Sequence, residues 1–439
     1  MLKTLRDAFK IKALRQKILF TFAMLVVVRI GSQLPVPGIN GAFFQSWFKS
    51  TTDGAFNFFD AITGGSFLNM SILALNITPY ITSSIIMQLL TIAIPKLEDM
   101  QREGEDGRKK IASITRYVTI ILALIQSTAL AISFGRSGYL TEYNALNVIC
   151  SITTLTAGSA FLMWIGERIT ENGIGNGISI VLVINIISRM PEDLATLFKR
   201  FVFNETVPFG TAALSACIII AVIIAMVVLV ILLNDGVRKI PVQYANKVQG
   251  RKMVGGHTSS LPLRINTAGV MPVIFASSLL QFPIIISSFV GYEGGGVWGE
   301  ILKYMNSNNW CVIAQIKYSI GMLVYIALII FFAYFYTSIT FNPLMIADNM
   351  KKQGGFIPGI RPGKATSDYL NNLLDRIVFI GAIGLTIVAI LPYVFSGLFQ
   401  ASISFGGTSL IIIVSVVLET MKQVESQMVV RNYKGFLEK

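Results

Sequence analysis

Few residues in this sequence have side chains that could carry out catalysis or bind a metal. The only histidine is His257, so no Ser–His pair can form inside an apolar segment, and a zinc site would lack its usual ligands. The three cysteines, Cys150, Cys217 and Cys311, are far apart and form no CxxC pair, which is typical of buried apolar cysteines. No HExxH, GxSxG or GxxxxGKS/T motif occurs. These residue types argue against an enzyme and predict neither a cofactor nor a metal.

The composition indicates a membrane protein. The chain has 439 residues, of which 53% are hydrophobic and only 13% charged, and its mean hydropathy is +0.66. Soluble domains carry about 25% charged residues, and apolar runs of about 20 residues are typical of transmembrane helices. We therefore predict an all-α polytopic membrane protein with ten transmembrane helices, at residues 18–33, 72–94, 114–134, 145–165, 174–190, 211–233, 267–290, 312–337, 377–396 and 401–418.

The ten spans divide into two halves of five, at residues 18–190 and 191–421. An odd number of spans gives the halves opposite orientations, so any internal repeat would be inverted. Each half contains a span with an internal proline, Pro79 in the second and Pro272 in the seventh.

The stretch Ser71–Gln88 is apolar yet contains Pro79, so its helix must kink or restart there. A break at membrane depth is tolerated only where protein or a water-filled cavity covers the freed backbone groups. Just upstream, residues 55–70 are too short and too broken to cross a bilayer. This combination predicts a gated path with a short re-entrant segment.

Basic residues set the orientation. Most of the 36 Lys and Arg residues lie in the segments that alternate on one side of the predicted spans, which by the positive-inside rule is the cytoplasmic side. Both termini are then cytoplasmic, including the basic segment 1–17 and the tail 422–439. The connections 234–266 and 341–376 lie on the same side and are long enough to suggest docking surfaces.

The polar residues within the spans are mostly neutral. Coupled solute transporters usually hold ionisable residues at membrane depth, whereas here Arg29 is the one basic residue deep in a span, and we expect it to pack against backbone carbonyls. The aliphatic interior favours a seal, but a small-solute permease stays open as the alternative. The neutral set comprises Asn76, Gln88, Gln126, Asn185 and Gln281.

Two signature stretches, Ser71–Gln88 and Trp164–Leu182, resemble the SecY family of bacterial protein-translocase channel subunits (the SecY/Sec61-alpha family). The likeness runs from about Leu5 to Tyr433. Further similar blocks are Leu34–Asn40, Leu261–Arg264, Ala268–Pro272, Phe341–Pro343, Ala347–Asn349, Gly359–Gly363 and Phe405–Ser409. The resemblance implies a channel that passes unfolded secretory proteins and releases transmembrane segments sideways into the cytoplasmic membrane.

The same resemblance implies an aliphatic pore ring, whose members by motif are Ile77, Ile81, Ile178, Leu182, Ile274 and Ile412. The i, i+4 spacing of the first two pairs gives each helix one continuous apolar stripe, and an aliphatic constriction can exclude ions by dewetting. One departure is Asn76, where the family usually has Gly. It puts an amide beside the pore-lining position.

Residues 55–70 are similar to the family's plug. Gly64 and Gly65 would let this segment hinge at low conformational cost, and the other residues assigned to the plug are Phe58, Phe59, Phe67 and Leu68. The alternative is that this segment is an interfacial re-entrant loop without a gating role. The resemblance also implies a lateral gate between the second–third and seventh–eighth spans, for which Gln88, Gln126 and Gln281 are the polar candidates.

The long basic connections match the family's docking sites for the SecA motor ATPase and the ribosome. The candidates are Arg251, Lys252, Arg361 and Lys364, and exposed basic residues of this kind also favour ribosomal RNA through its phosphates. The alternative is that these charges serve topology alone. The companion subunits SecE and SecG, together with signal sequences, nascent polypeptides and membrane lipid, complete the partners that the resemblance implies.

Overall fold

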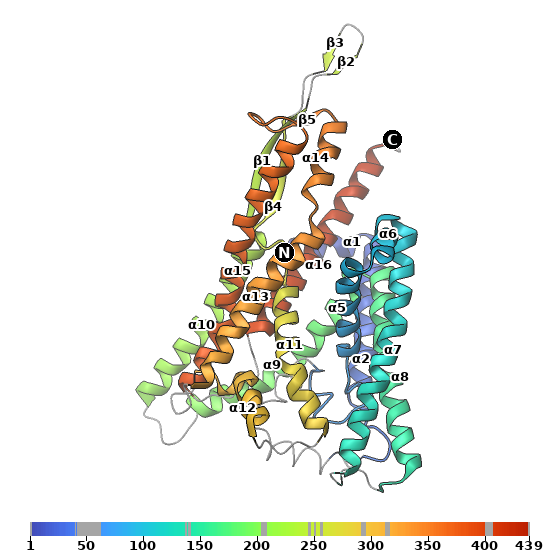
Figure 1. Ribbon diagram of the computed structural model, residues 1–439, viewed down its shortest axis with the longest axis vertical. Helices are drawn as coiled ribbons and strands as arrows, with labels where there is room; N and C mark the ends of the chain where they lie inside the picture. Colours follow the sequence, from blue (N-terminus) through green and yellow to red (C-terminus); the bar gives the residue numbers. More distant parts are fainter. Residues whose placement is uncertain are drawn as a thin grey trace.

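The structure is a computed structural model, and it describes residues 2–39, 41, 63–136, 138, 142–202, 209–244, 247–249, 252–254, 258–290, 296–311, 317–399 and 407–437. It is a bundle of long helices with a small sheet projecting from one end (Figure 1). The helices are α1 (Leu2–Lys10), α2 (Lys12–Gly31), α5 (Thr78–Ala93), α6 (Pro95–Arg102), α7 (Glu105–Arg136), α8 (Ala145–Asn172), α9 (Gly177–Phe201), α10 (Phe209–Asp235), α11 (Met271–Val290), α12 (Gly296–Met305), η1 (Ser307–Asn309), α13 (Ile320–Thr340), α14 (Pro343–Lys352), α15 (Lys364–Phe399) and α16 (Gly407–Leu437).

Each of the ten predicted spans overlaps one of the long helices. Within the described residues, five helices are long and apolar enough to cross a membrane by themselves, and there are six if α5 and α6, bent by 106° at the break between them, are counted as one span. The number of ten spans therefore remains a prediction. Three helices run more than ten residues beyond their predicted spans: α9 continues through Pro191 to Phe201, α15 already begins at Lys364, and α16 continues to Leu437.

The break predicted at Pro79 is the beginning of a helix. Helix α5 begins at Thr78, so the proline lies in the first turn, where its missing N–H costs no hydrogen bond. The residues before it, 64–77, form successive turns. The second predicted span, 72–94, is therefore helical only in its second part.

The helices pack as two groups. Helices α2, α5, α7 and α8 contact one another on one side, and α10, α11, α13, α15 and α16 contact one another on the other (Figure 1). Helix α9 joins the groups, because it packs against α2 and α8 as well as α10 and α16. The groups also meet where α7 contacts α11, less extensively than α9 contacts α16. The division into two halves of five spans stays a prediction, because α9, the last span of the predicted first half, contacts both groups.

Helix α10 explains how the bundle faces lipid. It is apolar on all sides, as expected of a membrane helix rather than a surface helix of a soluble protein. Several of its large aliphatic side chains are exposed in the isolated chain, including Leu214, Ile224 and Leu232.

The two long connections fold into structure that the all-helical expectation did not include. Strand β1 (Val237–Tyr244) pairs antiparallel with β4 (Thr258–Arg264) and, at its end, with β5 (Gly355–Phe356). Strands β2 (Lys247–Gln249) and β3 (Lys252–Val254) form a second hairpin further out (Figure 1). The signal was present in the sequence as the period-two pattern of β1, in which Ile240 and Val242 are buried.

Candidate pore and gate

The turns before α5 are held in place by a short strand-like contact. Pro35 and Ser71 form an antiparallel bridge. The backbone N–H of Val36 donates to the carbonyl of Met70 at 2.9 Å, and that of Ile72 donates to the carbonyl of Leu34 at 2.9 Å. The block beginning at Leu34 therefore positions the segment that leads into the candidate pore residues.

Three of the six predicted ring residues meet in one aliphatic cluster. Ile77, at the N-terminus of α5, is 1% exposed, and Ile81 and Ile178 are partly buried against the same cluster. Its buried members come from α2, the turn before α5, α8 and α9, and are Val28, Leu73, Ile77, Leu162, Ile165, Ile169 and Val181.

Two further ring residues meet in a second cluster. Ile412 of α16 is buried with Val183, Ile186 and Val416, and Ile274 of α11 packs against them. Ile180 of α9 packs against both clusters. Sequence reasoning missed Ile180 because an apolar residue in an apolar helix carries no signal of its own. The sixth predicted residue, Leu182, is 6% exposed and so also lies inside the bundle.

The start of α9 fixes the position of Ile178. The side chain of Asn176 caps the helix by accepting from the backbone N–H groups of Ile178 and Ser179, at 3.2 and 3.4 Å. The backbone N–H of Gly177 donates to Thr170 Oγ1 of α8 at 2.9 Å. Glycine is required at Gly166, on α8, because a Cβ there would lie 2.8 Å from Ile178 Cγ1.

The described part of the predicted plug, residues 63–70, packs on α9 as a series of turns. Phe58 and Phe59 lie outside the described residues, whereas Phe67 is buried and Leu68 partly buried in the cluster around Met70 and Leu155. Gly64 and Gly65 have φ angles of +65° and +82°, the left-handed region that favours glycine.

Arg29, on α2, lies in a polar part of the interior of the group formed by α2, α5, α7 and α8. Its Nη1 donates to the carbonyl of Gly64 and to Asn185 Oδ1, each at 3.5 Å. The expectation that this arginine packs against a backbone carbonyl is confirmed. Asn76, which precedes the candidate pore residue Ile77, is 1% exposed, and its Oδ1 accepts from Asn185 Nδ2 at 3.1 Å.

The three gate candidates do not share one environment. Gln88 and Gln126 are partly buried on α5 and α7, and Oε1 of Gln88 is buried without a hydrogen-bond partner. Gln281 of α11 lines a small cavity within the second helix group, together with Trp310 and Tyr325. Ile85 of α5 connects the two helix groups, because it packs against a hydrophobic cluster of the second group that includes Val273 and Phe275 of α11.

The comparisons with known proteins assign the family. The family model described as SecY matches residues 71–421. Protein translocase subunit SecY of Bacillus subtilis is 42% identical over 445 aligned residues, and that of Streptomyces galbus is 42% identical over 452, with 100% of both chains covered in each case. The chain belongs to the SecY family.

Solved structures of the same fold agree. A structure described as a protein conducting channel matches with a TM-score of 0.62 and 20% identity, covering 94% of this chain and 93% of the other. Sec61 in a canine ribosome-channel complex from the endoplasmic reticulum matches with a TM-score of 0.60 and 19% identity, covering 94% and 93%. None of these relatives is a solute permease, and that alternative has no support.

Three of the four candidate docking residues, Lys252, Arg361 and Lys364, lie in the described residues, at the end of the bundle that carries the sheet. Arg361 is exposed in a turn between Gly359 and Gly363, whose φ angles are +83° and +104°, and Thr366 Oγ1 donates to its carbonyl at 2.9 Å. Lys364 is exposed at the beginning of α15. Lys252 lies in β3, while Arg251 and His257 lie outside the described residues.

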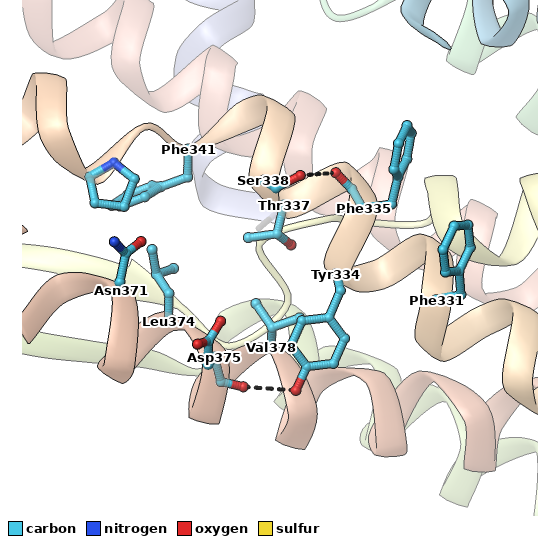
Figure 2. A pocket seen from close by; sticks show the side chains of 11 residues that line it. Phe331, Tyr334, Phe335, Thr337, Ser338, Phe341, Asn371, Leu374, Asp375 and Val378 are labelled. Carbon is cyan, nitrogen blue, oxygen red and sulfur yellow. Dashed lines mark hydrogen bonds between the residues drawn. The ribbon is translucent and has the colours of Figure 1, made fainter. Parts of the chain in front are cut away.

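This end of the molecule has a rigid base. The sheet, α14 and α15 share one core of Ile240, Val242, Leu263, Met350, Ile357, Leu370 and Ile377. Next to this core, a pocket of about 350 Å³ is lined by residues of both α13 and α15, several of them aromatic (Figure 2). There Tyr334 Oη donates to the carbonyl of Asp375 at 3.1 Å, which ties the two helices together where the 341–376 connection leaves them.

In the part of the chain that the structure describes, no group of three or more His, Cys, Asp or Glu side chains could hold a metal ion.

Proposed function

We propose that this chain is the central subunit of a protein-conducting channel that passes unfolded polypeptides across the membrane and releases transmembrane segments sideways into it. The observation that carries the proposal is full-length identity of 42% to protein translocase subunits SecY. The interior chemistry is compatible with it, because the candidate pore is aliphatic and has no reactive side chain. The chain is a channel subunit and not an enzyme.

The pore ring is the proposed seal. Ile77, Ile81 and Ile178 meet in one cluster, and Ile274 and Ile412 meet in another across α9. Aliphatic side chains offer no hydrogen bonds to water, so a narrow ring of them dewets and blocks ions. The same side chains offer no hydrogen bond or charge to any particular sequence, which suits the passage of unrelated polypeptides.

The proposed lateral gate is the weakly packed seam between α7 and α11. The two groups are also joined by α9, whose contacts with α10 and α16 are more extensive. Opening at the seam would therefore break few contacts while α9 keeps the groups together. A signal sequence or transmembrane segment would leave the pore through this seam, with Gln88 and Gln126 on its N-terminal side.

The exposed basic residues at the end of the bundle that carries the sheet support the proposed cytoplasmic partners. Arg361 stands on a fixed turn, where a guanidinium can reach a carboxylate or a phosphate, and relatives of this fold occur in ribosome complexes. We assign this surface, with Arg251, Lys252 and Lys364, to SecA and the ribosome, and we place both termini in the cytoplasm of a bacterial cell whose inner membrane holds the channel. SecE and SecG are the proposed companion subunits.

Site-specific crosslinking tests the function. A photocrosslinking residue at Ile274 should capture a secretory precursor stalled during export, because Ile274 belongs to the proposed ring. The matched control is Ile224 of α10, whose side chain is 57% exposed on the lipid-facing side. It should capture no precursor. Equal capture at the two positions, or capture at neither, would contradict the proposed pore.

A further inference from the structure

Asn76 occupies a backbone conformation that normally selects glycine. Its φ is +51°, in the left-handed region, where asparagine is among the few other residues tolerated. Glycine would satisfy the backbone equally well, so the conformation does not explain why this chain carries an amide.

The amide of Asn76 links the pore turn to α9. Its Oδ1 accepts from Asn185 Nδ2 at 3.1 Å, and both side chains are at most 2% exposed. The carbonyl of Asn76 also accepts from Ser159 Oγ of α8 at 3.1 Å. A buried amide has a high cost unless it is hydrogen-bonded, so these contacts stabilise one arrangement of the turn relative to α8 and α9.

The same turn of α9 holds residues 63–70. The carbonyl of Gly64 accepts from Ser188 Oγ at 3.4 Å and from Arg29 Nη1 at 3.5 Å. A Cβ on Gly64 would lie 2.5 Å from the carbonyl oxygen of Asn185, so the two backbones are in direct contact. Arg29 Nη1 also donates to Asn185 Oδ1. Asn185 therefore contacts the pore turn, α2 and the segment 63–70 together.

Several of these hydrogen bonds are long, as expected of a contact that must break when the segment 63–70 moves. Three of them lie at 3.4–3.5 Å, the long and weak end of the hydrogen-bond range. Each partner is a neutral amide, a hydroxyl, a backbone carbonyl or a guanidinium, and water can replace any of these bonds when the segment moves. Buried polar networks of this kind define one conformation more than they add stability.

We propose that Asn76, Asn185 and Arg29 form a polar latch that holds the segment 63–70 on α9 and sets the balance between closed and open channel in this chain. The proposal rests on the proposed channel function. The amide at Asn76 strengthens the latch where glycine would leave Asn185 with one partner fewer. Loss of that amide shifts the balance toward release of the segment.

The test measures release of the segment directly. In the assembled channel, reconstituted into vesicles and with its three native cysteines replaced by serine, a single cysteine at Ser66 reports on exposure, because Ser66 is 2% exposed. Asn76→Gly keeps the backbone conformation and removes the amide. We expect its rate of labelling by a water-soluble maleimide to rise about tenfold, which corresponds to about 1.4 kcal/mol.

Two further variants separate a latch from general loosening. Asn76→Asp retains an acceptor for Asn185 Nδ2 and should label no faster than the parent. Asn185→Ala should raise labelling as Asn76→Gly does, and combining the two should add little, because members of one network are not additive. The matched control is Asn144→Gly, since Asn144 makes no side-chain capping bond.

Unchanged labelling in both Asn76→Gly and Asn185→Ala would overturn the latch, as would full additivity of the two. The proposed function is tested separately on the same vesicles by crosslinking of a stalled precursor to Ile274. Precursor capture with unchanged labelling would reject the latch alone. Absence of precursor capture would reject the channel whatever the labelling shows.

Discussion

A methyl group added at the junction of α8 and α9 is a direct test of how the candidate pore is positioned. Gly177 begins α9, and a Cβ built on it would lie 2.0 Å from the carbonyl oxygen of Gly166 and 2.7 Å from Ile169 Cβ. Real Cβ atoms do not come within 3.0 Å of other heavy atoms. In Gly177→Ala the two backbones must therefore separate by at least the difference, 1.0 Å.

The expected loss of stability follows from two opposing effects. Overpacking in a close-packed interior costs about 1–3 kcal/mol, while replacing glycine by alanine gains at most about 1 kcal/mol in a helix interior, and less at its first residue. The bond from Gly177 N–H to Thr170 Oγ1 must lengthen as well. We expect a net loss of about 1–2 kcal/mol. If the loss falls only on the closed arrangement, the ratio of closed to open channel drops about tenfold.

The assays are the thermal unfolding temperature of the purified channel and its ion conductance in planar bilayers. Gly177→Ala should lower the unfolding temperature and raise the ion conductance, because Ile178 moves with the start of α9. Gly41→Ala is the matched control: its Cβ would meet its nearest neighbour, Asn69 O, at 3.9 Å, an ordinary contact. A Gly177→Ala channel as stable and as tight as the control would refute the reasoning.

Two predictions concern charges outside the membrane. Arg361→Glu should slow export at least tenfold, about 1.4 kcal/mol of partner binding, with normal insertion of the channel. The control Lys199→Glu makes the same charge change at an exposed position of α9, outside both long connections, and should export normally. Equal effects of the two substitutions would remove the docking assignment. The pKa of Glu300 is lowered from 4.5 by the hydrogen bond from Lys303 and by the nearby charge of Lys317. A carboxylate with a lowered folded-state pKa stabilises the fold fully above its unfolded pKa and loses this effect as the pH falls through the folded value. The difference in unfolding temperature between wild type and Glu300→Gln should therefore be constant at neutral pH and shrink on acidification below the unfolded pKa of 4.5. A difference that does not change with pH would contradict this prediction.

Much of the fold was readable in the sequence because a membrane restricts the possibilities. Backbone groups in lipid must be satisfied within their own segment, so an apolar run is expected to be helical; the run 72–94 departs from this in its first part, where residues 72–77 form turns covered by protein. Pro79 predicted the break before α5 for an equally local reason: proline has no N–H and fits only the first turn. The family blocks then pointed to Ile77, Ile178 and Ile274 as candidate pore residues.

Local patterns were less reliable in the cytoplasmic connections. The alternation in β1 was visible, but its pairing with β5 joins Gln243 to Phe356, residues separated by two helical spans. Nothing in either segment alone specifies that partner. The sheet therefore follows from packing of both connections on α14 and α15, which only the folded chain brings together.

The sequence by itself determined that this is a helical membrane protein of the SecY family with an aliphatic interior, because hydropathy and motif order are properties of the chain. Tertiary structure alone decided where the few polar interior groups go. Arg29, Asn76 and Asn185 come from three distant parts of the chain. A side chain buried in a low-dielectric interior must find its hydrogen-bond partners wherever packing places them, and no spacing in the sequence records which they are.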